Sequence, residues 1–282
     1  MFSDPRVAGY DQPGHPESAW RVTKTVQSLA GAGLKPERPS VAASEEDILS
    51  VHTPRHWEAL RTGSFHDPDT PHFRGIHEIA RISLSGALSA LDSALSGTPA
   101  FSLMRPPGHH AAHERIAGFC YLNNIAIACD KALRSGRRVA VLDIDVHHGD
   151  GTQEIFMERE GLVFVSLHQH PLYPGTGAET RANCLNFPLP PNTSESAYLT
   201  ALEQGIKRIA DFKPDLLAIS AGFDTYKECP LANLKLEKET YRKIGRMIAE
   251  TKLPRFGVLE GGYAEDLPVL IENFLEGFSS GV

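Results

Sequence analysis

Three residues of types that bind metals lie at alternate positions along one short stretch of the chain. Asp143, Asp145 and His147 alternate there with apolar residues. Since side chains of an extended segment alternate between faces, these three share one face, and an Asp and a His two apart can reach the same cation. Asp224, in a separate segment, offers a second carboxylate. Three nitrogen or oxygen ligands with an open fourth position are typical of catalytic zinc.

An alternative role for acidic residues here is helix capping. Asp150 or Thr152 would be a suitable N-cap for a helix that follows, and for Asp150 alone this interpretation is as reasonable as a catalytic one. It does not explain Asp143, Asp145 and His147 together, because their charges would be buried side by side without a partner. A bound cation accounts for them better.

Two adjacent histidines, His109 and His110, follow the residues Arg-Pro-Pro-Gly. A single histidine is often a packing residue, but a pair beside a metal site suits general acid–base catalysis. Asp143 and Asp150 remain once the metal ligands are assigned, and a carboxylate on one ring nitrogen fixes the tautomer and raises the basicity of the other. We therefore expect these two carboxylates to orient the histidines.

Tyr263 follows Glu260 and two glycines, so its turn can be tight. A tyrosine after Gly-Gly is usually a packed turn residue. Here the preceding strand is expected to end at the same rim as the metal ligands, which favours a hydroxyl that donates to a substrate carbonyl.

The elements that would position these residues alternate between short β-rich runs and amphipathic stretches, as in an α/β protein with a parallel sheet. Expected strands are 101–104, 138–143, 163–167, 216–220 and 256–259. Expected helices are 17–31, 76–96, 123–135, 195–211, 238–251 and 265–277, and 63–75, 168–191 and 225–235 are expected loops. Each expected strand is followed by a group of reactive residues, at the position where open α/β sheets bind their ligands. These groups are 105–110, 145–150, 168–177, 222–226 and 260–263.

Composition indicates one large globular domain over residues 1–282, and we expect it to be the catalytic domain that carries the residues above. The chain has 41% hydrophobic and 22% charged residues, and its net charge of -7 without a basic run argues against nucleic acid as a partner. We expect a cytoplasmic protein without a signal peptide or a membrane span, since no stretch of roughly 20 apolar residues is present. Its four cysteines show no Cys-x-x-Cys pair. No segment indicates an oligomer interface.

The motifs resemble those of the histone deacetylase and acetylpolyamine amidohydrolase superfamily, along most of the chain. They are GHPE at 14–17, RPPGHH at 105–110, GFC at 118–120, DIDVHHGDGT at 143–152, PGTG at 174–177, AGFD at 221–224 and EGGY at 260–263. This resemblance implies the arginase-deacetylase fold, with three layers: a central, mainly parallel sheet and helices on both faces.

The resemblance also implies a role for each matching residue. The zinc ligands would be Asp145, His147 and Asp224. The catalytic residues would be His109, His110, Asp143, Asp150 and Tyr263. A structural potassium ion would be bound by Asp143, Asp145, His147, Ser166 and Leu167, the last through its backbone. The acyl chain would contact Gly118, Phe119 and Tyr173. At two positions, Ala264 and Cys229, the chain differs from the residues that are common in this superfamily. Neither position is a metal ligand.

The implied activity is zinc-dependent removal of acetyl or other acyl groups from lysine side chains of proteins or peptides. The alternative substrate is an acetylated polyamine or another small acylated amine. Some polyamine-specific relatives have a Glu seven residues beyond the last ligand, whereas this chain has Leu231, which favours lysine. Glu17, Asp67 or Asp69 could still bring an acidic group to the mouth of the tunnel.

Two other classes of protein are less consistent with the sequence. An arginase-like ureohydrolase needs extra aspartates for a second metal, and the corresponding positions hold Gly149 and Tyr226. A non-catalytic acyl-lysine-binding protein would be favoured if Tyr263 or the histidine pair were missing, and both are present.

Overall fold

The computed structural model describes residues 1–280. It contains a six-stranded sheet in the order β1-β6-β5-β2-β3-β4, and every neighbouring pair is parallel. The strands are β1 (Ala100–Ser102), β2 (Val139–Asp143), β3 (Leu162–Gln169), β4 (Cys184–Leu189), β5 (Leu216–Ala221) and β6 (Arg255–Leu259). The five expected strands are present, and β4 is an additional one.

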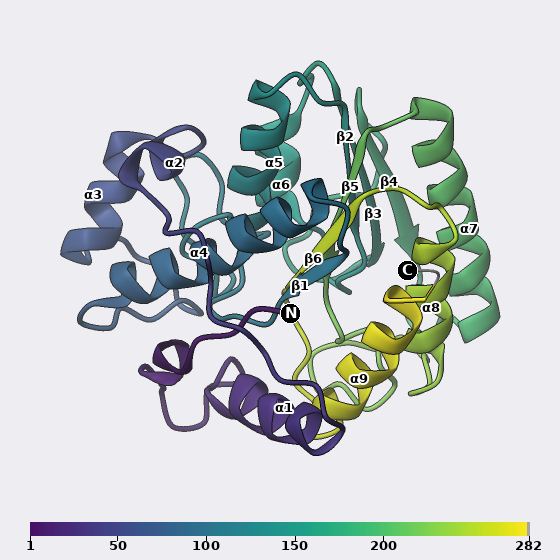
Figure 1. The fold of residues 1–282 in the computed structure, drawn as a ribbon, viewed down its shortest axis with the longest axis horizontal. Coiled ribbons are helices and arrows are strands. Elements are labelled where there is room, and N and C mark those ends of the chain that lie inside the picture. The colour runs from purple at the N-terminus through teal and green to yellow at the C-terminus, as the bar shows by residue number, and fades with distance from the viewer. Residues whose placement is uncertain (281–282) are drawn as a thin grey trace.

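Helices cover both faces of this sheet (Figure 1). They are α1 (Trp20–Gly31), α2 (Glu45–Leu49), α3 (Pro54–Thr62), α4 (Ile76–Leu95), α5 (Asn124–Arg134), α6 (Asp150–Phe156), α7 (Glu195–Phe212), α8 (Thr240–Ala249) and α9 (Leu267–Phe278), with a 3-10 turn at Pro5–Ala8. Within residues 1–280, no helix is both long and apolar enough to cross a bilayer.

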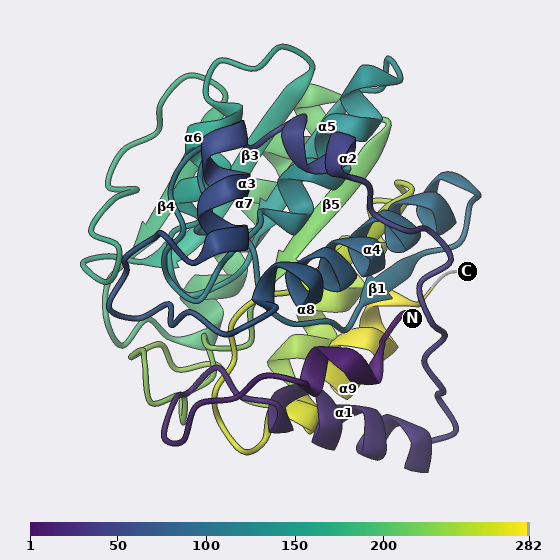
Figure 2. The same cartoon turned by 90° about the vertical axis from the view of Figure 1, so that its left-hand side faces the viewer.

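Alternate residues of the strands belong to two separate hydrophobic cores. In β2, Val139 and Val141 pack in the core that contains α4 and α5, whereas Ala140 and Leu142 pack in the core that contains α7, α8 and α9. Figure 2 shows α2, α3 and α6 on the α5 side of the sheet. Because side chains alternate along a strand, a central strand buried on both faces must be apolar throughout.

The short helices follow local signals in the sequence. Ser44 and Asp47 form a reciprocal capping box at the start of α2. Thr53 caps α3, whose first residue is Pro54, and Gly63 is the C-cap after Thr62, with a φ of 74°. Apolar periodicity predicts no helix between residues 32 and 75, so α2 and α3 are additional to the expected helices.

The expected loop 168–191 is partly wrong, because β4 lies within it at the edge of the sheet. Its register pairs Phe164 with Cys184 and Gln169 with Leu189. The strand contains Asn186 and Pro188, and proline is tolerated at a sheet edge, where one side of the backbone has no strand to pair with.

Candidate active site

The residues expected to be chemically active lie at the carboxyl ends of neighbouring strands. Asp143 is the last residue of β2, and Asp145 and His147 follow it. Asp224 lies three residues beyond β5, and Glu260 directly follows β6. Since all strands are parallel, their carboxyl ends meet along one edge, and segments far apart in sequence converge there.

Asp145, His147 and Asp224 form a compact cluster with one ligand atom from each residue within 4.8 Å of the others. Nδ1 of His147 lies 3.1 Å from Oδ1 of Asp145 and 3.1 Å from Oδ2 of Asp224. Within residues 1–280 this is the one cluster of three or more such residues with suitable geometry. No second cluster of the kind a two-metal ureohydrolase needs is found there.

Backbone N–H groups orient both carboxylates of this cluster. The Val146 N–H donates to Oδ1 of Asp224 at 2.8 Å, and the Gly261 N–H donates to Oδ2 of Asp145 at 2.7 Å. The approach of the backbone is so close that a side chain at Gly261 would collide with Asp224. Ligands held in this way are preorganised for a cation.

The electrostatics of the cluster also favour a cation. Burial and the neighbouring charge of Asp145 raise the pKa of Asp224. Burial disfavours the charged form of His147, but hydrogen bonds to Asp145 and Asp224 raise its pKa to about 9. Two buried carboxylates that share one positive partner are the arrangement that a divalent ion stabilises.

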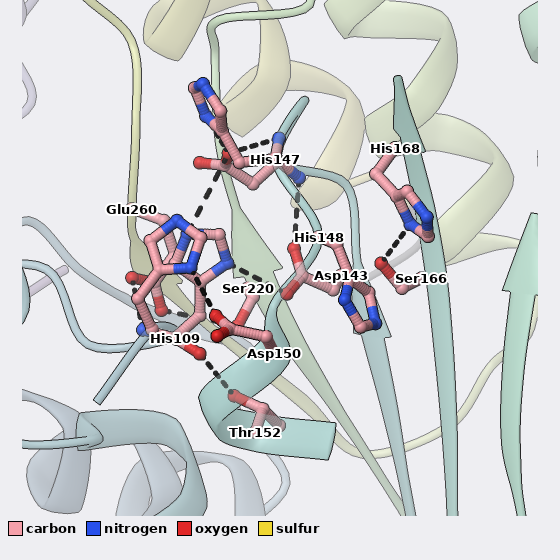
Figure 3. A network of polar contacts seen from close by, with 12 residues as sticks. His109, Asp143, His147, His148, Asp150, Thr152, Ser166, His168, Ser220 and Glu260 are labelled. Carbon is pink, nitrogen blue, oxygen red and sulfur yellow. Dashed lines mark hydrogen bonds and ion pairs between the residues drawn. The ribbon is translucent and has the colours of Figure 1, made fainter. Parts of the chain in front are cut away.

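The histidine pair lies beside this cluster, and each ring is bound to its own carboxylate. Nδ1 of His109 lies 3.0 Å from Oδ2 of Asp143, and Nδ1 of His110 lies 2.7 Å from Oδ1 of Asp150. The two imidazole rings are 4.0 Å apart between centroids. Figure 3 shows His109 beside Asp143, Asp150 and Glu260.

The two histidines differ in charge. Burial disfavours the imidazolium of His109, but the carboxylates of Asp145 and Asp143 outweigh it and raise its pKa well above 6.5. Burial and repulsion from His109 lower the pKa of His110 to about 4, despite its hydrogen bond to Asp150. The lowered pKa of His110 favours its neutral form, which can accept a proton, whereas the two carboxylates favour the imidazolium form of His109.

Asp150 is not the N-cap of α6, because Gly149 occupies that position and Asp150 is the first helical residue. Thr152 is buried inside the helix and is not a cap either. The capping interpretation is therefore wrong for both residues. Instead, Asp150 binds His110 through Oδ1, while Arg115 donates to Oδ2 at 2.6 Å.

Tyr263 lies at the same rim, with its ring packed edge-on against Phe119 at 5.8 Å between centroids. The guanidinium of Arg21 lies 4.9 Å from the centre of the Tyr263 ring and donates from Nε to the Gly262 carbonyl at 2.8 Å. Burial raises the pKa of Tyr263 well above 10, so its hydroxyl stays protonated and can donate.

These groups surround a cavity of about 330 Å³. Its lining residues are His15, Pro16, Pro68, Asp69, Pro107, His109, His110, Gly118, Phe119, His147, Leu172, Tyr173, Leu231, Gly261 and Tyr263. The expected substrate-binding residues Gly118, Phe119, Tyr173 and Leu231 are all among them. Gly118 has a φ of 59°, and a Cβ there would lie 2.6 Å from the His110 ring. This position requires glycine.

Of the three acidic residues considered for the mouth, Asp69 lines the cavity. Glu17 does not, because it is buried and accepts from Arg105 Nη2 at 2.7 Å and from Arg21 Nη1 at 3.1 Å. The suggestion that Glu17 reaches the mouth is therefore wrong. Asp67 is not a lining residue.

The residues expected to bind potassium include two members of the cluster, Asp145 and His147, together with Asp143 on β2 and Ser166 and Leu167 on the neighbouring β3. Asp143 on β2 is in register with Ser166 on β3, and Leu167 follows on the same strand. Both Ser166 and Leu167 are fully buried, and Oγ of Ser166 lies 2.9 Å from Nδ1 of His168 (Figure 3).

Three residues near the cavity were not predicted from the sequence. Glu260 accepts from the Gly108 and His109 N–H groups, Arg21 contacts the Tyr263 turn, and Arg115 contacts Asp150. Arg21 is separated from its partner Gly262 by 241 residues. Position in the sequence carries no signal for such a contact, although Glu260 lies within a motif that was recognised.

Residues 15–276 match the family model described as "Histone deacetylase domain". The chain is also 36% identical to a protein named "Probable deacetylase" from Archaeoglobus fulgidus, over 94% of this chain and 80% of the relative.

This chain belongs to the histone deacetylase family.

Other members of the histone deacetylase family are similarly close. "Acetylpolyamine amidohydrolase 1" from Pseudomonas aeruginosa is 40% identical over 75% of this chain and 65% of the relative. A crystal structure of an acetylpolyamine aminohydrolase from Burkholderia pseudomallei superimposes with a TM-score of 0.90 at 28% identity, covering 99% of this chain and 98% of that one. The crystal structure of the HDA15 HD domain superimposes with a TM-score of 0.91 at 29% identity, covering 100% of this chain and 90% of that one.

The structural likeness confirms the arginase-deacetylase α/β fold expected from the motifs. Membership of the histone deacetylase family makes the chain a hydrolase that acts on amide bonds, with deacetylase or amidohydrolase activity.

Proposed function

We propose that this protein is a zinc-dependent deacylase that removes acetyl or other acyl groups from lysine side chains of proteins or peptides, with residues 1–282 acting as one catalytic domain. The observation that carries this proposal is the convergence of three metal-ligand atoms, two His–Asp pairs and Tyr263 on one cavity. Each of these groups has a defined part in hydrolysing an amide.

Asp145, His147 and Asp224 would hold the zinc ion. Two carboxylates and one imidazole with an open fourth position fit a catalytic zinc site, and the backbone donors already orient both carboxylates. When bound there, zinc would polarise the substrate carbonyl and lower the pKa of a bound water toward about 7.

The residues around the metal cluster would move and stabilise the charges. Nδ1 of His110 is held by Asp150, which leaves Nε2 to take a proton from water and later give it to the leaving amine. The positive charge of His109 and the hydroxyl of Tyr263 would stabilise the oxyanion that develops on the carbonyl. The products are a free amine and a carboxylate.

The walls of the cavity suit an acyl-lysine side chain. Phe119 and Tyr173 provide aromatic surface for a methylene chain, and Leu231 contributes an apolar group where an acidic one would bind a second ammonium. Asp69 lines the same cavity and can meet a peptide backbone N–H. These features favour an acyl-lysine peptide over an acetylated polyamine as the substrate.

An acetylated polyamine or another small acylated amine is the second candidate substrate. It is supported by two observations: relatives named acetylpolyamine amidohydrolase are about as similar to the chain as those named deacetylase, and Asp69 could pair with a distal ammonium. A parallel assay of acyl-lysine peptides and acetylated polyamines tests both. Higher kcat/KM for the peptides supports our proposal, and higher kcat/KM for the polyamines replaces it with the second.

We also propose a structural potassium ion held by Asp143, Asp145, His147, Ser166 and Leu167. The support is the buried, oxygen-rich position shared by Asp143 and Ser166 on adjacent strands. Exchange of potassium for tetramethylammonium should lower the thermal stability of the zinc-loaded protein.

A further inference from the structure

Glu260 is a fully buried acid that links the histidine pair to the neighbouring strands. Its Oε2 accepts from the Gly108 N–H at 2.7 Å and from the His109 N–H at 3.2 Å. Its Oε1 accepts from the Ser220 hydroxyl at 3.3 Å. Figure 3 shows Glu260 directly beside His109. One carboxylate therefore fixes the backbone from which the His109 and His110 side chains project.

The topology explains why this side chain can reach that backbone. β1 and β6 are parallel neighbours, with Ser102 in register with Val258. The turn after β1 and the residue after β6 therefore leave the sheet side by side. The turn has little room to shift, since even a Cβ at Gly108 would lie 2.6 Å from the Asn124 nitrogen.

The backbone from Glu260 to Gly262, which leads to Tyr263, is also fixed by hydrogen bonds. Arg21 donates from Nη2 to the Glu260 carbonyl and from Nε to the Gly262 carbonyl. The next N–H, that of Gly261, donates to the candidate metal ligand Asp145. The segment that carries Tyr263 is therefore fixed relative to Glu260.

We infer that Glu260 is a positioning residue, which sets the placement of His109 and His110 relative to Tyr263 and the metal cluster. This inference rests on the proposed function. Glu260 does not line the cavity, so it does not touch substrate and acts through the backbone of Gly108 and His109. Its three accepted hydrogen bonds come from segments after β1 and on β5, which it joins to the end of β6.

Two substitutions separate this role from general stability. Glu260→Ala removes the acceptor, and kcat should fall by roughly 10- to 100-fold because a displacement of about 1 Å in a catalytic group can cost that much. KM should stay within about threefold, because the cavity wall is unchanged. Glu260→Gln should restore most of kcat, since its amide oxygen can accept both backbone N–H groups and its NH₂ can donate to Ser220.

A matched control is available on α5. Asp130 is also a buried acid, bound to Arg134 and Arg159. Asp130→Ala removes a buried carboxylate outside the cavity, and its kcat should equal that of the wild type. All variants should be compared at equal zinc content. Equal losses of kcat in Glu260→Ala and Asp130→Ala, or in Glu260→Ala and Glu260→Gln, would overturn the inference.

A second measurement does not depend on turnover. Hydrogen–deuterium exchange at the Gly108 and His109 amides should be at least about tenfold faster in Glu260→Ala than in wild type, and close to wild type in Glu260→Gln. Unchanged exchange in Glu260→Ala would contradict the inference. If the wild-type protein hydrolyses no acylated amine, the proposed function fails, while the exchange rates still decide whether Glu260 holds this backbone.

Discussion

Oδ1 of Asp150 lies 2.7 Å from Nδ1 of His110, and Arg115 occupies the other oxygen of the same carboxylate. This contact fixes which nitrogen of His110 faces the protein and leaves Nε2 toward the cavity. His109 makes a similar contact with Asp143, but lies closer to the metal cluster, with Nε2 3.8 Å from Oδ1 of Asp145. The two histidines therefore have different surroundings and different expected roles.

His110→Ala should lower kcat by at least about 100-fold, because the attacking water loses its base and the leaving amine loses its acid. The zinc content should be unchanged, since His110 is not among the clustered metal ligands. Steady-state kinetics with metal analysis on the same preparation tests this. Turnover near wild type would assign the base to another residue.

Tyr263→Phe should retain the fold and the metal but lose about 100-fold or more in kcat, because only the donor to the developing oxyanion is removed. The ring contacts with Phe119 and Arg21 remain possible in the variant. Single-turnover rates would show whether the loss is in the chemical step. A variant with normal turnover and bound zinc would make Tyr263 a packing residue of the turn.

The free energy of unfolding should decrease as pH falls from about 6.5 toward 4. Buried His52 and His56 stack with ring centroids 4.0 Å apart. Burial lowers the pKa of His56 to about 4, so the folded protein resists protonation there while the unfolded chain takes up a proton below about 6.5. The stability that depends on neutral His56 is thus complete above pH 6.5 and is lost progressively toward pH 4.

Urea unfolding at pH 7.5 and 5.0 measures this effect. His56→Gln should reduce the difference in stability between the two pH values, whereas the exposed His66→Gln provides a control that should leave the difference unchanged. An equal pH effect in wild type and His56→Gln would show that other groups are responsible.

Leu231→Glu should shift selectivity toward acetylated polyamines, because it adds a carboxylate to the wall of the cavity. A solvated ion pair is worth about 0.2–1 kcal/mol, which corresponds to a change of up to roughly fivefold in the ratio of kcat/KM values. Leu95→Glu, at the exposed end of α4, adds the same charge outside the cavity and should have no effect. A shift of the same size in both variants would rule out local recognition at Leu231.

The main sheet and the clustered ligands were predictable because their signals are local. Buried strands such as β2 and β5 are continuous apolar runs, and the period of two placed Asp145 and His147 on one side of the backbone. β4 was missed because an edge strand with a half-exposed face lacks such a run. The contacts of Arg21 and Glu260 depend on how distant segments pack, and no local pattern encodes them.

The central claim is that amide hydrolysis depends on a metal ion bound by Asp145, His147 and Asp224. The most direct measurement is release of free amine from an acetyl-lysine peptide and an acetylpolyamine by a preparation verified as metal-free, before and after zinc is added back. We predict no activity on either substrate without metal and recovery of activity at about one zinc per chain. Full activity in the verified metal-free protein would contradict the account.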